Sequence, residues 1–311
     1  MKGYHIYSQF RDDSQYDSIN HLALLTSILT WKKNFGSIHL YTNKRFLESI
    51  SKWNIHLEYD SIDTYELENI PHKDYLEKYW TFPKIYITNI IAQRGEPFAL
   101  VDTDLWIKDS SVINFDKDIY FYHSEIFNEE LINSTYPNPN LWLTQSELIE
   151  YDWNTLPINT ALVFFNSNFQ SLISEWYFLS ERIIERCKNN NTSNINPSSH
   201  TLFLEQRMLS TMANKMGINY GTILPASFIT YVDTIKDAGN EWYPNLDSTN
   251  ELIKIKKSIK HIWGIKKYYQ NPSVREMIVS NMLDVLEDFD GVNQKYEKLY
   301  KEISLLFTQN S

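Results

Sequence analysis

Two aspartates separated by one residue follow directly after an apolar run. Residues 98–101 are Phe-Ala-Leu-Val, and Asp102, Thr103 and Asp104 come next. Four apolar residues without a charge predict a strand that is buried on both faces, as in a parallel sheet. Alternate residues at the carboxyl end of such a strand point to the same side, so both carboxylates can converge on one point. This arrangement favours a hard divalent cation, although Asp-x-Asp is also common in solvated turns.

A second set of polar residues lies later in the chain, in the run His261-Ile262-Trp263-Gly264-Ile265-Lys266. A neutral imidazole such as that of His261 can join two carboxylates on one cation, especially manganese, which accepts oxygen and nitrogen ligands. Gly264 permits a close approach of the backbone to an anion, and Lys266 supplies a positive charge for a phosphate. The surrounding lysines form a basic cluster, most of which we expect to be a solvated helix face: Lys254, Lys256, Lys257, Lys260 and Lys267.

The bulk composition limits the classes of protein that the chain can form. It has 311 residues, a formal net charge of -10 and a single cysteine. This length can bury one large α/β domain or two closely joined lobes, and the acidic balance argues against a nucleic-acid partner. One cysteine allows no intramolecular disulfide and indicates a reducing compartment. Because neither a signal-peptide stretch nor a run of about 18 apolar residues is present, we expect a cytoplasmic protein without a membrane span.

Strands and helices alternate along the amino-terminal part, which predicts a doubly wound and mainly parallel sheet. The expected strands are 3–8, 37–42, 55–59 and the run at 98–101, and the expected helices are 16–34, 44–53 and 73–94. Further on we expect strands at 119–123 and 159–166, helices at 167–187 and 199–216, and a polar loop at 188–199. With only 8 glycines and no glycine-rich phosphate loop, a dinucleotide-binding fold and a P-loop hydrolase are both disfavoured.

Two more helices, at 272–288 and 292–307, meet at Asp290-Gly291 and form a carboxyl-terminal extension. We expect this extension to pack on the preceding domain. Peripheral contact with the inner face of a membrane, through the lysine cluster at 254–267 or through these helices, is the minority alternative.

The order of these short motifs resembles one family, the metal-dependent GT-A-fold retaining glycosyltransferases of the glycogenin and lipopolysaccharide galactosyltransferase kind. That family carries an Asp-x-Asp after a buried strand, an Asn-Ala-Gly-like strand, an Asp-Gln pair opening a helix, and a late His-x-x-Gly-x-x-Lys. The same order occurs here over roughly residues 3–270, as Asp102-Thr103-Asp104, Asn159-Thr160-Ala161, Glu205-Gln206 and His261 to Lys266. Thr160-Ala161 in place of Ala-Gly, and Glu205 in place of Asp, identify a divergent member.

The resemblance implies an α/β fold of the GT-A type, with a mixed central sheet flanked by helices and a carboxyl-terminal helical extension. Residues 1–270 would be the glycosyltransferase domain, with a nucleotide-sugar-binding half at 1–110 and an acceptor and sugar half at 111–270. Residues 271–311 would be the extension.

The activity implied by the resemblance is that of a hexosyltransferase in polysaccharide biosynthesis. It would move a sugar from a nucleotide-sugar, a UDP-sugar by analogy, to a hydroxyl of a glycan, a lipid-linked glycan or a protein, with retention of configuration. Manganese or magnesium would be the cofactor, held by Asp102, Asp104 and His261. The implied donor-binding residues are Tyr7, Ser8, Lys84, Asp102, Thr103, Asn159, Thr160, Gly264 and Lys266.

Glu205 and Gln206 would lie beside the anomeric carbon as the catalytic residues. Since a carboxamide is a poor nucleophile, we favour front-face attack by the acceptor hydroxyl, with the leaving phosphate taking its proton and Gln206 lending a carbonyl dipole. The transition state would resemble an oxocarbenium ion, as in glycoside hydrolysis.

Two other classes remain open at this point. Phosphohydrolases of the haloacid-dehalogenase kind also use Asp-x-Asp at a strand end, but they carry it on the first strand, with Thr or Val where this chain has Trp106. A non-catalytic sugar-binding or partner-binding relative would be expected to lose a metal ligand, and the sequence retains all three candidates.

Overall fold

The computed structural model describes residues 1–9, 17–124, 139–189, 202–224, 254–255, 257–262 and 271–308. The chain divides into two compact units. Unit 1 comprises Met1–Thr64, Val101–Ile113 and Thr230–Ser311, and unit 2 comprises Tyr65–Leu100 and Asn114–Ile229. Each unit is therefore built from segments that are distant in the sequence.

The strands confirm the expected α/β class with a mixed central sheet flanked by helices. The strand order is β3-β2-β1 in unit 1 and β4-β7-β6-β8 in unit 2. In unit 1, β1 (Lys2–Tyr7), β2 (Ile38–Thr42) and β3 (Ser61–Asp63) pair in parallel. In unit 2, β6 (Ile119–Ser124) runs antiparallel to β7 (Ile158–Phe165) and parallel to β8 (Tyr220–Thr222). Every residue of β4 (Phe98–Val101) is buried, as the uninterrupted apolar run predicts.

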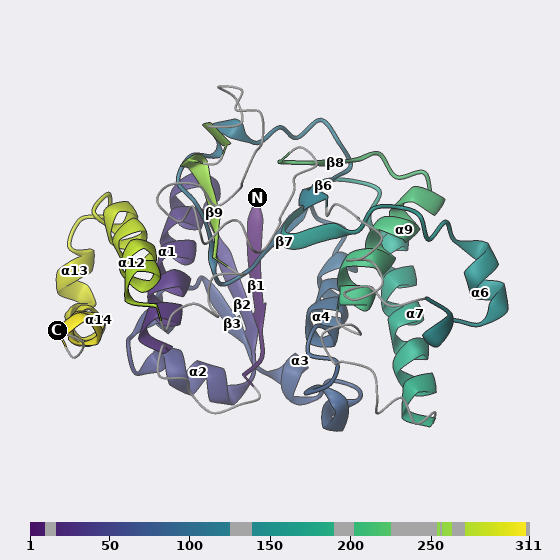
Figure 1. Cartoon of the computed structure of the whole chain (residues 1–311), viewed down its shortest axis with the longest axis horizontal. Helices are drawn as coiled ribbons and strands as arrows, with labels where there is room; N and C mark the ends of the chain where they lie inside the picture. Colours follow the sequence, from purple (N-terminus) through teal and green to yellow (C-terminus); the bar gives the residue numbers. More distant parts are fainter. Residues whose placement is uncertain are drawn as a thin grey trace. The chain divides into compact units, whose positions relative to one another are not determined.

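The helices of unit 1 gather around α1 (Asp17–Phe35). The carboxyl-terminal helices α12 (Pro272–Leu286) and α14 (Glu297–Thr308) both pack on α1, as expected for the extension. Figure 1 shows α12 beside α1. Asn271 caps α12 by accepting hydrogen bonds from the amides of Ser273 and Val274. The expected helix at 292–307 is divided into α13 (Val292–Lys295) and α14.

One strand prediction in unit 1 is wrong. Residues 55–59 do not form a strand, because Ile55–Glu58 is a 3₁₀ turn (η1) that follows α2 (Lys44–Ser51). Asn54 adopts a left-handed backbone with φ of 61°, which turns the chain out of α2 and closes the turn through a bond from Leu57 N to Asn54 O. Extended pairing begins only near Asp60, whose amide and carboxylate both bond the backbone of Ile38.

The helices of unit 2 are arranged around α7. The helices α4 (Phe82–Ala92) and α9 (Met208–Lys215) both pack on α7 (Gln170–Asn189). The remaining short elements are α3 (Tyr65–Glu68), η2 (Lys73–Tyr75), η3 (Ser110–Val112, in unit 1), η4 (Pro139–Leu141) and α6 (Gln145–Glu150).

The helix expected at 73–94 is correct only in its second half. Residues 73–81 form η2 and turns, and α4 begins at Phe82 with Pro83 in its first turn. Proline lacks an amide donor, and the first turn of a helix is where that donor has no partner inside the helix. Pro83 therefore marks the start of a helix rather than a kink within one.

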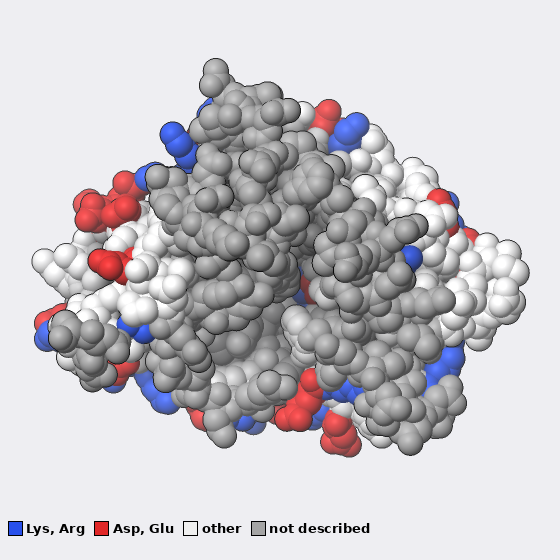
Figure 2. Space-filling view, viewed as in Figure 1, with Lys and Arg blue, Asp and Glu red and all other residues white. Residues whose placement is uncertain are grey.

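Helix hydrophobicity and the exposure of the lysines bear on the alternative of a membrane contact. Within the described ranges, no helix is both long and apolar enough to cross a bilayer. On the face in Figure 2, the basic side chains lie among acidic ones around the edge of the view. Of the lysine cluster, Lys254 and Lys257 are exposed and Lys260 is half-buried, whereas Lys256, Lys266 and Lys267 lie outside the described residues.

A buried carboxylate holds the extension to the rest of unit 1. The Glu58 side chain accepts hydrogen bonds from Lys295 Nζ and Tyr296 Oη, and Tyr296 is 2% exposed. Burial raises the pKa of Glu58, but the hydrogen bonds from Lys295 and Tyr296 and the charge of Lys295 outweigh it and hold this pKa below its usual value. The ionised form of Glu58 is thus favoured by folding.

We expect Glu58→Gln to lower the free energy of unfolding at pH 7 by about 1–2 kcal/mol, since it removes a charged acceptor from the buried Tyr296 hydroxyl and from the partly exposed Lys295. Because folding lowers the pKa of Glu58, its contribution is complete above the unfolded value of about 4.3 and is lost as the pH falls through the folded value. The free energy of unfolding, measured with urea between pH 3 and pH 7, should therefore change less with pH in the variant than in wild type. Glu297→Gln, which breaks the exposed pair with Lys301, is the control. The same pH dependence of the free energy of unfolding in Glu58→Gln and wild type would contradict a stabilising role of ionised Glu58.

Candidate functional site

The two aspartates lie in a tight turn that directly follows β4. Residues 102–104 leave the strand, and a hydrogen bond of 3.2 Å from Leu105 N to Asp102 O closes the turn before β5 (Leu105–Ile107) begins. The carboxylates of Asp102 and Asp104 therefore converge because the chain turns, and not because they alternate along a continuing strand. Thr103 occupies the middle of the turn.

His261 reaches the aspartates through a two-stranded antiparallel ribbon. It is the last residue of β9 (Ile259–His261), which pairs with β5 so that His261 stands opposite Leu105. A bond of 3.1 Å from Ile262 N to Asp104 O extends this pairing to the second aspartate itself. Sequence reasoning did not predict this ribbon, because each strand has only three residues and β9 reads Ile-Lys-His, without an apolar run.

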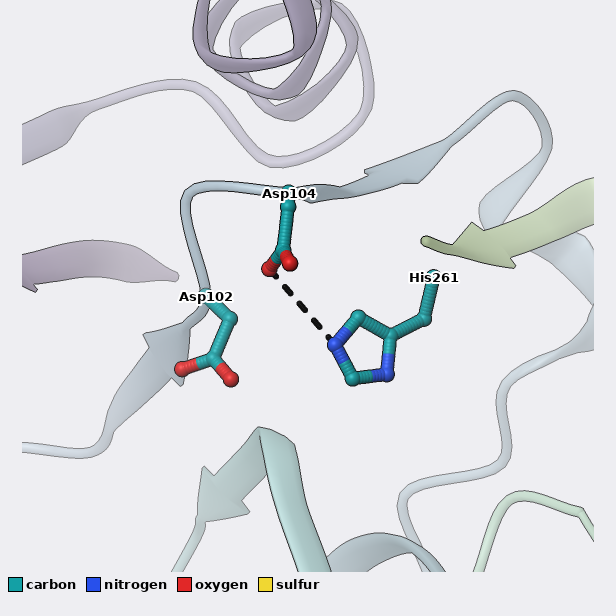
Figure 3. Close-up of side chains that lie close together, drawn as sticks. All are labelled: Asp102, Asp104 and His261. Atoms are coloured by element: carbon teal, nitrogen blue, oxygen red, sulfur yellow. Dashed lines mark ion pairs between the residues drawn. The ribbon is translucent and has the colours of Figure 1, made fainter. Parts of the chain in front are cut away.

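Asp102, Asp104 and His261 form a compact cluster within unit 1. One ligand atom from each lies within 4.8 Å of the other two, and His261 Nε2 is 3.5 Å from Asp104 Oδ1. The side chains of His261 and Asp104 are only 7% and 8% exposed. Figure 3 shows all three side chains directed into the same space, with the aspartates on one side and the imidazole on the other.

The cluster fits a divalent cation by ligand type and by separation. In an octahedral site with metal–ligand bonds of about 2.1 Å, neighbouring and opposite ligand atoms are roughly 3–4 Å apart. The ligand atoms of the cluster lie within 4.8 Å of one another, so small side-chain rotations would bring them to the separations of a metal site. Two carboxylates with one imidazole suit manganese or magnesium better than a thiolate-loving metal.

A buried neutral histidine lies next to this cluster. His5 is 0% exposed, and burial lowers its pKa to about 3, although the negative charge of Asp104 acts in the opposite direction. His5 Nδ1 is 2.7 Å from the hydroxyl of Tyr59, and its Nε2 is 3.1 Å from Ser27 Oγ. Burial also raises the pKa of Tyr59, so both groups are neutral at pH 7 and add no charge beside the aspartates.

Three other predicted site residues meet within unit 2. Lys84 Nζ, on α4, donates to Thr160 O and to Glu205 Oε1, both at 2.8 Å. The Thr160 hydroxyl, on β7, also donates to Glu205. With the side chains of Lys84 and Glu205 only 12% and 9% exposed, this is a buried ion pair. The structure thus joins residues that stand 76 and 121 positions apart in the sequence.

Glu205 and Gln206 lie in a short π-helical segment, η5 (Phe203–Arg207), ahead of α9. Single π-helical turns are rare and often occur at functional sites. Trp176 Nε1 donates to Leu204 O at 2.6 Å and fixes this segment on α7. Gln206 is 8% exposed, so it is buried within unit 2 and does not lie at an exposed helix start.

The remaining predicted donor residues are less informative. Asn159 is 4% exposed and its side-chain oxygen accepts from Ala161 N at 3.0 Å, a local contact within β7. Tyr7 ends β1 with 39% exposure and packs its ring 4.3 Å from that of Phe46, and Ser8 is half-buried. Gly264 and Lys266 lie outside the described residues.

Comparisons with known proteins give weak similarities to solved structures. No protein-family model matches the chain, and no curated protein matches its sequence. The PaToxG glycosyltransferase is similar with a TM-score of 0.42 and 10% identity, over 91% of this chain and 85% of that one. The galactosyltransferase LgtC, solved with donor and acceptor sugar analogues, is similar with a TM-score of 0.42 and 9% identity, over 96% and 100%.

A third similar structure is that of mouse xyloside xylosyltransferase 1 without ligand, with a TM-score of 0.42 and 8% identity over 84% of this chain and 97% of that one. All three are glycosyltransferases. Because every TM-score is below 0.5 and no identity exceeds 10%, these similarities establish no activity for this chain. We therefore base the function on the side chains described above.

We expect Asp102→Asn, Asp104→Asn and His261→Gln each to weaken Mn²⁺ binding by about 10–100-fold or more, since each removes a candidate ligand. Electron paramagnetic resonance of free Mn²⁺ during a titration measures this directly. Asp109→Asn is the matched control, because Asp109 belongs to the same segment but bonds Ser111. Equal Mn²⁺ affinity for wild type and all three variants would show that the cluster is not a cation site.

Breaking the buried pair in unit 2 should strongly destabilise the protein, because one charge is then left buried without a partner. Lys84→Met leaves the Glu205 carboxylate buried without its cation, so we expect a loss of about 3 kcal/mol in the free energy of unfolding. A double-mutant cycle with Glu205→Gln should give a coupling energy of about 2 kcal/mol. The more exposed pair of Lys73 and Glu68 is the control and should give less than about 1 kcal/mol. Similar coupling in both cycles would contradict this description.

Proposed function

We propose that this protein is a metal-dependent glycosyltransferase of the GT-A type. It would transfer a hexose from a nucleotide-sugar, most directly a UDP-sugar, to a hydroxyl of a glycan, a lipid-linked glycan or a protein. The observation that carries the proposal is the cluster of Asp102, Asp104 and His261, in which an Asp-x-Asp turn meets a distant histidine. The order of the sequence motifs along the chain adds independent support.

Asp102, Asp104 and His261 would hold the cation. Bound there, Mn²⁺ or Mg²⁺ supplies positive charge that stabilises the diphosphate as it leaves. The low exposure of Asp104 and His261 matters because electrostatic stabilisation is stronger where water is excluded. Their fixed backbone positions matter too, since a preorganised site needs no rearrangement at the moment of reaction.

The resemblance assigns the donor contacts to Tyr7, Ser8, Thr103, Lys84, Asn159 and Thr160. Gly264 and Lys266 would contact the diphosphate. The contacts of Lys84 modify this assignment, because its ammonium already bonds Glu205 and Thr160. These two bonds would hold the Lys84 side chain in place before the donor binds.

The bonds of Glu205 also bear on the mechanism. Its carboxylate oxygen Oε1 accepts from Lys84 and from the Thr160 hydroxyl, which lowers its nucleophilicity and favours a positioning role. Gln206, the next residue, carries a carboxamide that is a poor nucleophile. We therefore propose front-face attack by the acceptor hydroxyl with retention of configuration, in which the leaving phosphate takes the proton of that hydroxyl and Gln206 offers a carbonyl dipole.

A thermal-shift panel tests the proposal. Nucleoside diphosphates and nucleotide-sugars are added with and without Mn²⁺ to wild type, Asp104→Asn and Asp109→Asn. We expect one base to raise the melting temperature only when Mn²⁺ is present, in wild type and Asp109→Asn but not in Asp104→Asn. A ligand that binds only the folded state must stabilise it, by about 2.7 kcal/mol at a hundredfold excess over Kd.

The panel also separates this proposal from its competitors. A shift with any nucleotide that persists without metal would argue for a different binding mode. No shift with any nucleotide would sink the transferase proposal, and phosphatase substrates would be assayed next. With a donor identified, proton NMR of the transfer or hydrolysis product reports its anomeric configuration, and inversion would refute the front-face route.

A further inference from the structure

Helix α1 carries three polar side chains on one face that all bond the backbone of the segment bearing the aspartates. Ser27, Thr30 and Asn34 are spaced by three and four residues, which places them one above another along the helix. Ser27 and Thr30 are each 1% exposed, so they are buried hydroxyls and not surface polar groups. Burying them is costly unless each has a partner.

Their partners lie between residues 102 and 110. Ser27 Oγ donates to Asp102 O at 3.4 Å, and Thr30 Oγ1 accepts from Ile107 N at 3.3 Å. Asn34 uses both ends of its carboxamide: Nδ2 donates to Ile107 O at 2.8 Å, and Oδ1 accepts from Ser110 N at 3.0 Å. The three side chains therefore bond four backbone groups, beginning at the first aspartate.

The bonds of Thr30 and Asn34 to Ile107 occupy the edge of β5 that faces away from β9. On the β9 side, Asp104 O accepts from Ile262 N and Lys108 N donates to Ser258 O. Residues alternate in the direction of their backbone groups along a strand, so the amide and carbonyl of Ile107 point to the opposite side. In a wider sheet, a neighbouring strand would hydrogen-bond to that edge. Here the side chains of Thr30 and Asn34, on helix α1, take the place of that strand.

His5 orients the first of these side chains. Ser27 Oγ has one proton, which it gives to Asp102 O, so the bond from His5 must come from Nε2–H. Nδ1 then accepts from the Tyr59 hydroxyl at 2.7 Å. The resulting chain of donors runs from Tyr59 through His5 and Ser27 to the backbone of Asp102, and each member is buried.

We infer that Ser27, Thr30 and Asn34 are positioning residues of the metal centre, which hold the Asp102–Ile107 backbone so that both carboxylates meet His261. None of the three reaches the cluster with its own side chain; each acts through the backbone that carries the ligands. The inference rests on the proposed function in that it takes the cluster to bind a cation. Supporting groups of this kind matter because ligand geometry must hold within about 0.5 Å.

The chain offers a closely matched pair of variants for the test. Thr26 and Thr30 are both buried, and both donate to a carbonyl of the preceding turn, Thr26 to Leu22 O at 2.8 Å and Thr30 to Thr26 O at 2.7 Å. Only Thr30 also accepts from Ile107 N. Thr26→Val and Thr30→Val therefore remove the same type of intrahelical bond, and they differ in the contact with β5.

We expect Thr30→Val to weaken Mn²⁺ binding by about tenfold, the lower end of the effect of losing a supporting hydrogen bond at a metal site. Thr30→Ser, which keeps the hydroxyl, should restore most of the affinity, and Thr26→Val should bind as wild type does. Mn²⁺ titrations followed by electron paramagnetic resonance give the dissociation constants without an assay of transfer. Urea unfolding of each variant confirms that it is folded.

A second variant keeps the test decisive if buried substitutions at position 30 impair folding. Asn34 is half-buried near the end of α1, and Asn34→Ala removes two backbone contacts of the 102–110 segment. It should also weaken Mn²⁺ binding about tenfold. Wild-type affinity in both Thr30→Val and Asn34→Ala, or an equal loss in Thr26→Val, would overturn the positioning role while leaving the cation site intact. Absence of Mn²⁺ binding by the wild-type protein would overturn the cation site and the positioning role together.

Discussion

Buried backbone groups need hydrogen-bond partners, and β5 is a three-residue strand that is buried along its whole length. One edge of β5 is satisfied by β9, and the amide and carbonyl of Ile107 on the other edge are satisfied by α1. This single requirement determines where the Asp102–Asp104 turn lies and which residue faces it. If β5 paired with β9 one residue out of register, another residue would stand opposite Leu105. The His261 side chain would then point to the other face and could not complete the ligand set.

The two polar clusters have opposite electrostatic character. In unit 2, Lys84 and Glu205 compensate each other, and the Thr160 hydroxyl adds a further bond, so the cluster needs no external ion. In unit 1, two carboxylates approach one imidazole within 4.8 Å, which concentrates negative charge. The adjacent His5 stays neutral because burial lowers its pKa to about 3. The charge of the unit 1 cluster therefore attracts a cation, and the paired charges of the unit 2 cluster order side chains.

Sequence patterns predicted most elements because their signals are local. The uninterrupted apolar run at 98–101 gave a buried strand, and the helical spacing after residue 16 gave α1. The errors at 55–59 and 73–81 fall where an apolar pattern is present but a left-handed residue, Asn54 or His72, turns the chain. Neither Asn nor His requires that conformation, so composition alone did not indicate it.

The sequence by itself determined which residue types are present and which element carries them: carboxylates after a buried strand, a late histidine, and a lysine on the helix before the aspartates. Only the tertiary structure decided which of them meet. His261 lies near Asp104 because β9 pairs with β5, and Glu205 bonds Lys84 because η5 packs against α4. It also revealed Ser27, Thr30 and Asn34, whose spacing along α1 looks like ordinary helix until their backbone partners are known. Such pairings join residues far apart in the sequence, and they depend on the packing of whole elements rather than on any local preference.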